Sequence, residues 1–316
     1  MKMLRFLLST LLALAVSGCN NKLPEPVTPD PEEKDSVSLR ILFIGNSFTK
    51  DAVEHLPGIL YAAGIKDVQM VHMYYGGRTI PEYNDGWNTA TDYHCYESNP
   101  GQRGWTDVSG KSLAMVAADG RWDIVTIQEH TGRKLAWGWT SAEQTAVQGI
   151  VDKVREAQRQ VGGSPKLYYI LSQAYFNLDK TQNTSKPFST TDEMWAVIAA
   201  QGKTAVETCG FDGVISTGAM LQNLRTSSLN NNIGLTRDGY HMDYGISRYG
   251  AACTVFETVI GPYHENITLD DNSYRYNQSS TEDGSWTTPV TDATVPIALQ
   301  AARYAIDKPY EVTKMK

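Results

Sequence analysis

Two short motifs near opposite ends of the chain contain the residue types that nucleophilic catalysis needs. One is a glycine-led turn that ends in Ser47, and the other places Asp238 three residues before His241 with Gly239 between them. A carboxylate that binds one imidazole nitrogen fixes the tautomer and leaves the other nitrogen free as a base. A serine becomes a good nucleophile only when such a base lies within hydrogen-bonding reach. We therefore predict that Ser47, His241 and Asp238 act together as nucleophile, base and orienting acid.

The segments around Ser47 predict the elements that would position it. Residues 41–44 form an apolar run ended by glycine, which is typical of a strand buried on both faces. Residues 51–64 have apolar side chains at helical spacing, and residues 68–74 predict a second strand. Strand, helix and strand in about thirty residues have the size of a right-handed parallel crossover. Open α/β sheets bind ligands at the carboxyl ends of their strands, where Ser47 would lie.

Strands and helices alternate along the rest of the chain. We expect further strands at 122–128, 167–171 and 213–216, and helices at 111–118, 141–160, 191–209, 219–225, 246–260 and 295–306. This alternation predicts an α/β fold in which helices cover both faces of a parallel sheet. Three polar segments, 76–110, 235–244 and 272–288, have little periodicity and are expected to be loops.

The local sequences at both motifs resemble the SGNH (GDSL-like) hydrolase superfamily. The resemblance rests on GNSFT around Ser47 and LTRDGYH around Asp238 and His241, and is strongest to a branch of uncharacterised secreted or lipid-anchored members. It covers most of residues 39–260. It implies a flavodoxin-like three-layer α/β/α fold with a five-stranded parallel sheet in the order 2-1-3-4-5. It also implies an SGNH-type serine hydrolase that cleaves esters through an acyl-enzyme.

The same resemblance implies an oxyanion hole, for which the sequence offers several donors. The backbone N–H groups of Ser47 and Gly77 match two of them, although Gly77 could be only a turn glycine. The third family block normally supplies an asparagine, which is missing here, so the amide of Gln128 or the ring of His130 would replace it. Asn46 also stands where the family usually has aspartate. Each well-aimed donor is worth roughly 3–4 kcal/mol.

The first residues read as a targeting signal. Lys2 and Arg5 precede an apolar run that is too short to span a bilayer, and small residues come directly before Cys19. This layout resembles a bacterial lipoprotein signal, with a plain secretory signal as the alternative. We predict a signal peptide at 1–18, lipidation of Cys19, a tether at 19–37, and a single domain at 38–316 with a C-terminal extension. The predicted location is the cell envelope, anchored by lipid to the outer membrane of a Gram-negative bacterium.

Composition excludes several classes of partner. The net charge of −7 and the lack of basic runs argue against nucleic acid, and neither GxxxxGK[ST] nor GxGxxG occurs, so no cofactor is expected. His94 and Cys95 have no obvious partners for a metal site. With Cys19 lipidated, Cys95, Cys209 and Cys253 allow one disulfide at most, and three free thiols are equally consistent with the sequence.

We predict that the substrate is an O-acyl ester, in particular an O-acetyl ester, on a carbohydrate or a small molecule. This rests on family analogy, lipid anchoring and four tryptophans in loops expected to flank the site, Trp87, Trp105, Trp137 and Trp139. Arg78 and Arg237 adjoin the motifs and would either meet an acidic substrate or form structural ion pairs. The alternative function is a lipid-anchored glycan-binding protein that keeps the fold without the activity.

Overall fold

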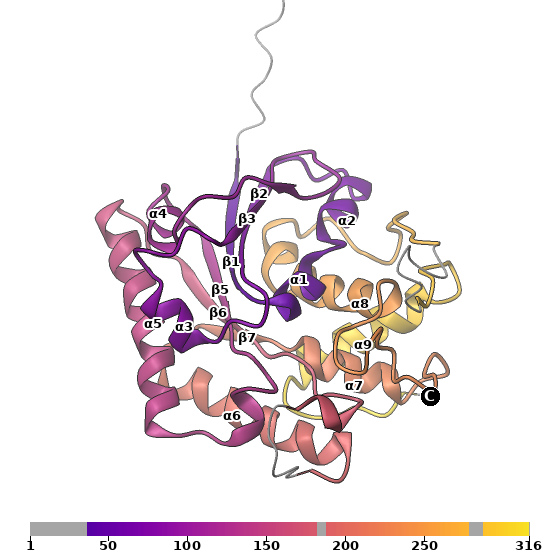
Figure 1. Ribbon diagram of the computed structural model, residues 1–316. Coiled ribbons are helices and arrows are strands. Elements are labelled where there is room, and N and C mark those ends of the chain that lie inside the picture. Colours follow the sequence, from indigo (N-terminus) through magenta and orange to yellow (C-terminus); the bar gives the residue numbers. More distant parts are fainter. Residues whose placement is uncertain (1–36, 182–187, 278–286, 316) are drawn as a thin grey trace, which may run out of the picture. The chain divides into compact units, whose positions relative to one another are not determined.

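A mixed sheet of seven strands organises the chain in the computed structural model (Figure 1). The structure describes residues 37–181, 188–277 and 287–315, which belong to one compact unit. The predicted signal peptide at 1–18, Cys19 and the tether up to residue 36 lie outside the described residues. Within the described part of the chain, no helix has the length and apolar character needed to cross a membrane.

Five of the strands run parallel and form the centre of the sheet. In hydrogen-bonded order they are β2 (Val68–Tyr74), β1 (Leu39–Gly45), β5 (Ile124–Gln128), β6 (Lys166–Ile170) and β7 (Gly213–Ile215). Counted along the chain, these parallel strands lie in the order 2-1-3-4-5. Most of their side chains are buried, which explains why these strands read as apolar runs without alternation.

Two further strands correct the prediction of a five-stranded parallel sheet. β3 (His94–Ser98) pairs antiparallel with β2, and β4 (Thr106–Asp107) pairs antiparallel with β3. Both come from the segment 76–110, which we expected to be a loop. β4 has only two residues, and β3 has no regular alternation of buried and exposed side chains, so neither gives a recognisable sequence pattern.

Helices cover both faces of the sheet (Figure 1). On one side lie α3 (Ile80–Asp85), α4 (Leu113–Ala117), α5 (Ser141–Gln160) and α6 (Thr191–Thr208). On the other side lie α1 (Ser47–Val53), α2 (Leu56–Ala62), α7 (Thr217–Arg225), α8 (Ile246–Val255) and α9 (Val295–Asp307). The described residues also form short helical turns: η1 (Leu135–Trp137), η2 (Leu178–Lys180), η3 (Phe256–Ile260) and η4 (Gly261–Tyr263). The C-terminal helix α9 packs on α7 and α8, as predicted for residues 295–306.

The helix after β1 differs from the prediction because of two residues. Asn46 caps α1 by accepting a hydrogen bond from the Phe48 N–H at 3.0 Å, so the helix starts at Ser47. Pro57 lies in the first turn of α2, where a missing N–H is tolerated, and the predicted single helix becomes two.

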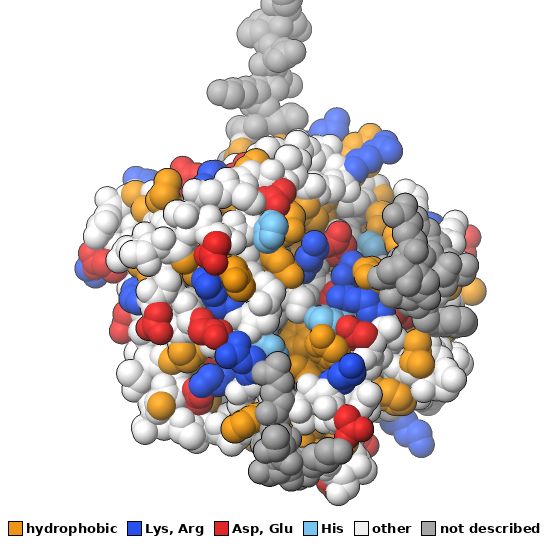
Figure 2. Space-filling view, viewed as in Figure 1, with side chains coloured by type: hydrophobic (Ala, Val, Ile, Leu, Met, Phe, Trp, Pro, Cys, Tyr) orange, Lys and Arg blue, Asp and Glu red, His pale blue; other side chains and the backbone are white. Residues whose placement is uncertain are grey.

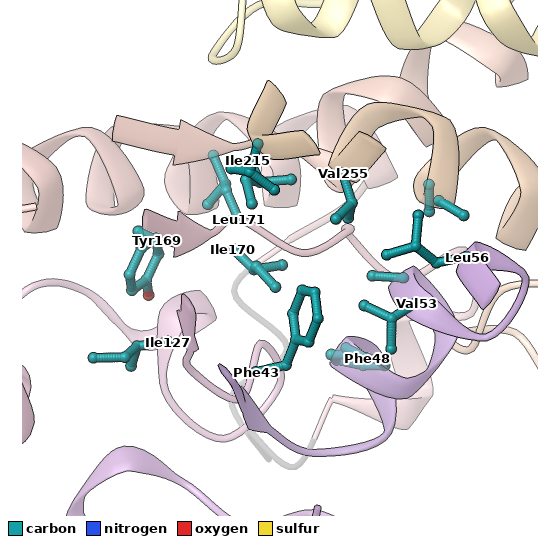
Figure 3. Close-up of a cluster of buried hydrophobic side chains, with 14 of the residues drawn as sticks. Phe43, Phe48, Val53, Leu56, Ile127, Tyr169, Ile170, Leu171, Ile215 and Val255 are labelled. Carbon is teal, nitrogen blue, oxygen red and sulfur yellow. The ribbon is translucent and has the colours of Figure 1, made fainter. Parts of the chain in front are cut away.

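The hydrophobic core between the sheet and α1 fixes the start of that helix (Figure 3). Phe43 and Ile170 extend from β1 and β6 toward Phe48 and Val53 of α1, with Val255 of α8 beside them. All five side chains are at most 1% exposed. Burying a side chain of this size contributes roughly 1.5–3 kcal/mol. The helix that begins with Ser47 is therefore held firmly against the sheet.

Candidate functional site

Ser47, His241 and Asp238 lie together, although 194 residues separate Ser47 from His241. The Ser47 hydroxyl donates to His241 Nε2 at 2.7 Å, and His241 Nδ1 donates to Asp238 Oδ2 at 2.6 Å. The imidazole is thereby held in one tautomer with its second nitrogen against the serine. In this arrangement the ring can accept the serine proton and so activate the hydroxyl as a nucleophile.

Asn46 joins the turn before Ser47 to the neighbouring loop. Its Oδ1 accepts from the Phe48 N–H, and its Nδ2 donates to the Arg78 carbonyl oxygen at 3.0 Å. An ionised aspartate could accept the first bond but could not donate the second. The bond to Arg78 therefore explains why this chain has asparagine rather than aspartate at position 46.

The turn that carries Asp238 and His241 is fixed by its own backbone. Asp238 Oδ1 accepts from the His241 N–H at 2.8 Å and from the Tyr240 N–H at 3.2 Å. Gly239 has φ +95°, and a Cβ there would come within 2.6 Å of the Asn177 side chain, so only glycine fits. Burial acts to raise the pKa of Asp238, but its hydrogen bonds from His241 outweigh this and hold the pKa below its usual value.

A buried ion cluster anchors this turn to α1. Asp51 is fully buried and accepts from Arg237 Nη1 at 2.9 Å, Arg248 Nε at 2.9 Å and the Met242 N–H at 3.0 Å. Burial alone would raise the pKa of Asp51, but Arg248 and Arg237 lower it below its usual value. Arg237 and Met242 flank the Asp238–His241 pair, so Asp51 fixes both ends of the turn. Nothing in the sequence signalled this role, because an aspartate on an amphipathic helix normally faces water.

A pocket of about 530 Å³ opens beside the Ser47 hydroxyl and the His241 ring. Its lining combines small backbone-exposing residues, aromatic rings and basic side chains: Ser47, Phe48, Tyr74, Gly76, Gly77, His130, Tyr175, Lys180, Arg237, Tyr240 and His241. Near the middle of the face viewed in Figure 2, hydrophobic and histidine side chains lie exposed with basic side chains around them.

Two backbone N–H groups at this pocket, those of Ser47 and Gly77, are candidates for binding an oxyanion. Within the described ranges, neither the Ser47 N–H nor the Gly77 N–H donates a hydrogen bond. Gly77 has φ +71°, and its carbonyl oxygen accepts from Arg133 Nη1 at 2.9 Å, which fixes the orientation of this loop. The geometry leaves both groups available to a negatively charged oxygen placed next to Ser47.

Gln128 has a different place from the one predicted for an oxyanion donor. Its side chain is fully buried and does not line the pocket. Its Oε1 accepts from the Asn46 N–H and from Thr49 Oγ1, both at 3.1 Å, and its Nε2 donates to the Glu129 carbonyl oxygen. Gln128 therefore supports the turn before Ser47 from behind.

His130, the alternative donor, does line the pocket. Its Nδ1 accepts from the Arg133 N–H at 3.2 Å, so the neutral ring carries its proton on Nε2. Burial, reinforced by the charge of Arg133, lowers the pKa of His130 to about 4. The ring is thus neutral at neutral pH and presents an N–H donor rather than a base.

Glu129, whose role was not predicted, connects the segment after Gly77 to the segment that starts at His130. Its carboxyl group is 3% exposed and accepts from the Ile80 N–H at 3.0 Å and from the His130 N–H at 2.6 Å. Burial raises the pKa of Glu129 to about 8, although these hydrogen bonds act in the opposite direction. The loop that follows Gly77 and the segment that starts at His130 are therefore tied to one carboxyl group.

The four tryptophans expected to flank the site do not line this pocket. Trp87 is buried, and Trp105 and Trp137 donate through Nε1 to the carbonyl oxygens of Val53 and Gly132. Instead, tyrosines provide the aromatic lining: Tyr74, Tyr175 and Tyr240.

The two arginines next to the motifs make internal contacts. The Arg78 guanidinium lies 4.0 Å from the centre of the Tyr75 ring and 3.8 Å from the Asp92 carboxylate. Arg237 pairs with Asp51 but also lines the pocket. Both arginines therefore have the structural role that the sequence left open, and Arg237 additionally faces the pocket.

Among the described residues, no cysteine lines this pocket. Cys95, Cys209 and Cys253 are buried free thiols. Among the described residues, no group of three or more histidine, cysteine, aspartate or glutamate side chains could hold a metal ion.

Known proteins give this fold a family. A crystal structure of a DUF4886 family protein from Bacteroides uniformis ATCC 8492 is 27% identical, covers 88% of this chain and 98% of its own, and superposes with a TM-score of 0.72. A proposed acylhydrolase from Bacteroides fragilis NCTC 9343 is 18% identical over 75% of this chain and 89% of its own, with a TM-score of 0.39. That likeness is too distant to inform the chemistry here, and no curated protein matches the chain. The family model for the domain of unknown function DUF4886 matches residues 40–291, and the chain therefore belongs to the DUF4886 family.

Proposed function

We propose that this protein is an SGNH-type serine esterase that hydrolyses O-acyl esters. The observation that carries the proposal is the continuous hydrogen-bonded chain from Ser47 through His241 to Asp238 at the edge of an open pocket. Nucleophile, base and orienting carboxylate at such distances are the signature of acyl transfer.

In the first half of the reaction, Ser47 Oγ attacks the ester carbonyl carbon while His241 Nε2 takes the hydroxyl proton. The carbonyl oxygen becomes negatively charged and accepts hydrogen bonds from the Ser47 N–H, the Gly77 N–H and His130 Nε2–H. Each such donor lowers the barrier by roughly 3–4 kcal/mol when it is aimed at the developing charge. The C–O bond to the leaving alcohol then breaks, and His241 gives its proton to that oxygen.

In the second half, water resolves the acyl-enzyme. His241 Nε2 takes a proton from the water as its oxygen attacks the acyl carbon, and the same donors stabilise the second tetrahedral intermediate. The bond to Ser47 Oγ breaks, and the proton returns to the serine. Asp238 stays ionised throughout and stabilises the imidazolium. The products are an alcohol and a carboxylic acid, and no metal or cofactor takes part.

The substrate in this proposal is an acylated carbohydrate, with acetyl as the favoured acyl group. Support comes from the tyrosine-rich pocket lining, since aromatic rings offer flat surfaces to sugars, and from the predicted envelope location. That location rests on the layout of residues 1–19, with membrane attachment through the lipid on Cys19 alone. Loss of palmitate incorporation in a Cys19→Ala variant would support the anchor.

Ester hydrolysis is tested by acetate release from p-nitrophenyl acetate and from acetylated oligosaccharides. We expect Ser47→Ala to lower kcat by about 10³-fold or more, because the nucleophile is removed. Ser141→Ala is a matched control, since Ser141 is also the first residue of a capped helix but is exposed and does not line the pocket. Wild-type turnover no faster than that of Ser47→Ala on every ester would instead support the glycan-binding protein without activity.

A further inference from the structure

We infer that the pocket extends into a second binding site for an acidic sugar, which we call the hairpin subsite and define by Lys50, Tyr74, His94 and Tyr96. The inference rests on the proposed function and deepens it by naming the substrate class, an ester of a carboxylate-bearing carbohydrate. His94 and Tyr96 belong to β3, the unpredicted antiparallel strand, so the subsite also gives the inserted segment a role.

The aromatic rings of the subsite form a continuous surface that begins at the site. Tyr74, the last residue of β2, lines the pocket beside Ser47 and lies opposite His94 on β3. The ring centres of Tyr74 and Tyr96 are 5.9 Å apart, and those of His94 and Tyr96 are 5.6 Å apart with planes only 9° from parallel. The three rings are partly or largely exposed, so their surface is open to a ligand. His94 is held in place by Asp107 Oδ2 at 2.7 Å.

Lys50 places a positive charge against this aromatic surface. It lies three residues after Ser47 on α1, and residues at this spacing lie on the same face of a helix. Its Nζ lies 4.7 Å from the centre of the Tyr96 ring and 5.6 Å from that of Tyr74. Within the part of the chain that the structure describes, no carboxylate pairs with Lys50, whereas Lys111 and Lys134 do form ion pairs. The Lys50 ammonium is therefore available to an anionic ligand.

A cavity of about 210 Å³ adjoins the subsite at Lys50 and Tyr96. It is lined by one basic, one acidic and several aromatic or apolar side chains: Lys50, Val53, Glu54, His72, Tyr96 and Trp105. Glu54 can accept hydrogen bonds from sugar hydroxyls, while Lys50 can bind a carboxylate. A purely apolar ligand would leave both charged groups without a partner, which is costly. A sugar ring that carries a carboxylate satisfies all of these groups.

Charges on the other side of the Ser47 pocket favour the same ligand class. Lys180 and Arg237 line that pocket, and among the described residues Lys180 has no ion-pair partner. The chain as a whole carries a net charge of −7, so basic groups gathered at this one place act against the overall charge. Because Asp51 compensates the charge of Arg237, the attraction on this side of the pocket comes mainly from Lys180. An acidic glycan would therefore be attracted to the site.

The test is a ligand-observed NMR titration of the purified protein with trigalacturonate and with its triamide, in which each carboxylate is a neutral amide. Neither probe carries an ester, so binding is measured without hydrolysis. We expect wild type to bind the acid about fivefold or more tightly than the amide, the effect of one partly exposed charge pair. Lys50→Gln should reduce this ratio to about twofold or less, with the remainder due to Lys180, whereas Lys203→Gln, an equal charge change at an exposed position on α6, should keep it.

Tyr96→Leu separates the aromatic contribution from the charge. It keeps an apolar side chain of similar size in β3 and should weaken both probes by a similar factor of about three to ten. Equal affinity of wild type for acid and amide, or equal loss of preference in Lys50→Gln and Lys203→Gln, would overturn the inference. Failure of the proposed function would look different, because ester turnover would then not depend on Ser47 whatever the binding preference.

Discussion

Each side of the pocket is held by a buried carboxyl group, but the two groups have different surroundings. One lies between arginine side chains, and the other accepts hydrogen bonds from backbone N–H groups. The side that carries Asp238 and His241 is anchored by Asp51, which is surrounded by Arg237 and Arg248. The side that carries the proposed oxyanion donors is anchored by Glu129, whose hydrogen-bond donors are the backbone N–H groups of Ile80 and His130.

This difference sets how each side responds to pH. Although burial opposes it, the charges of Arg248 and Arg237 hold the pKa of Asp51 below its usual value, so it stays ionised at neutral pH. No arginine or lysine forms an ion pair with Glu129 among the described residues, and burial raises its pKa to about 8. The base is therefore positioned by a fixed charge, whereas the donor side is positioned by a group that titrates near neutral pH.

Removing the Asp51 carboxylate, whose charge Arg237 and Arg248 compensate, should have the largest effect on stability. Asp51→Ala leaves Arg237 and Arg248 buried without a counter-ion, and we expect it to lower the free energy of unfolding by about 3–5 kcal/mol. Urea denaturation measures this loss. The control is Asp270→Ala, which breaks an exposed pair with Arg303 and should cost less than about 1 kcal/mol. Similar losses in the two variants would contradict the anchoring role of Asp51.

The proposed donor on the other side is tested through kcat. His130→Ala removes the N–H that we propose as an oxyanion donor and should lower kcat by about 10²-fold, or roughly 3 kcal/mol, with little change in KM. His130→Gln keeps an N–H donor in this region and should recover part of the loss. If His130→Ala changed KM alone, the ring would serve ground-state binding and not the transition state.

The buried carboxyl group of Glu129 should make the stability of the fold depend on pH. Its folded-state pKa of about 8 lies above its ordinary value of 4.5, so the folded protein keeps a proton that the unfolded chain releases. The stability from this proton is fully present below about pH 4.5 and is lost as pH rises through about 8. Relative to wild type, Glu129→Gln should therefore gain roughly 1 kcal/mol per pH unit between these limits, measured by urea denaturation. Parallel pH curves for the two proteins would show that Glu129 is ionised in the folded state.

The smallest effect is expected at the side-chain amide of Asn46, which joins the turn before Ser47 to the loop that contains Arg78. Asn46→Asp loses the hydrogen bond from Nδ2 to the Arg78 carbonyl oxygen, and kcat/KM should fall about fivefold, or roughly 1 kcal/mol. Asn88→Asp makes the same chemical change at an exposed position and should leave kcat/KM unaltered. Equal kinetics in Asn46→Asp and wild type would mean that Arg78 needs no support from Asn46.

The sequence was most informative where a local pattern carries the structure. The parallel strands were predicted because strands buried on both faces must be apolar throughout, and α5 was predicted from the residues at its start. The grouping of Ser47, Asp238 and His241 followed from two motifs placed at one edge of such a sheet. α3 could also have been found, because Thr79 and Glu82 form a capping box and Pro81 lies in its first turn.

Other features depend on contacts between distant segments. The choice between Gln128 and His130 depends on the Asn46 N–H and Thr49 hydroxyl, which occupy the Gln128 amide and have no pattern in sequence. Asp51 and Glu129 look like ordinary surface acids until the elements around them are placed. β3 and β4 are short and extend an existing sheet edge. Their strand character comes from pairing, of β3 with β2 and of β4 with β3, rather than from their own residues.

The central claim, that His241 activates Ser47 as a nucleophile, is tested most directly by covalent labelling. A fluorophosphonate reacts with activated serines, and peptide mapping by mass spectrometry identifies the modified residue. We predict one adduct, located on Ser47, that is absent in Ser47→Ala and forms far more slowly in His241→Ala. An unmodified wild-type protein, or labelling that persists in Ser47→Ala, would contradict the account.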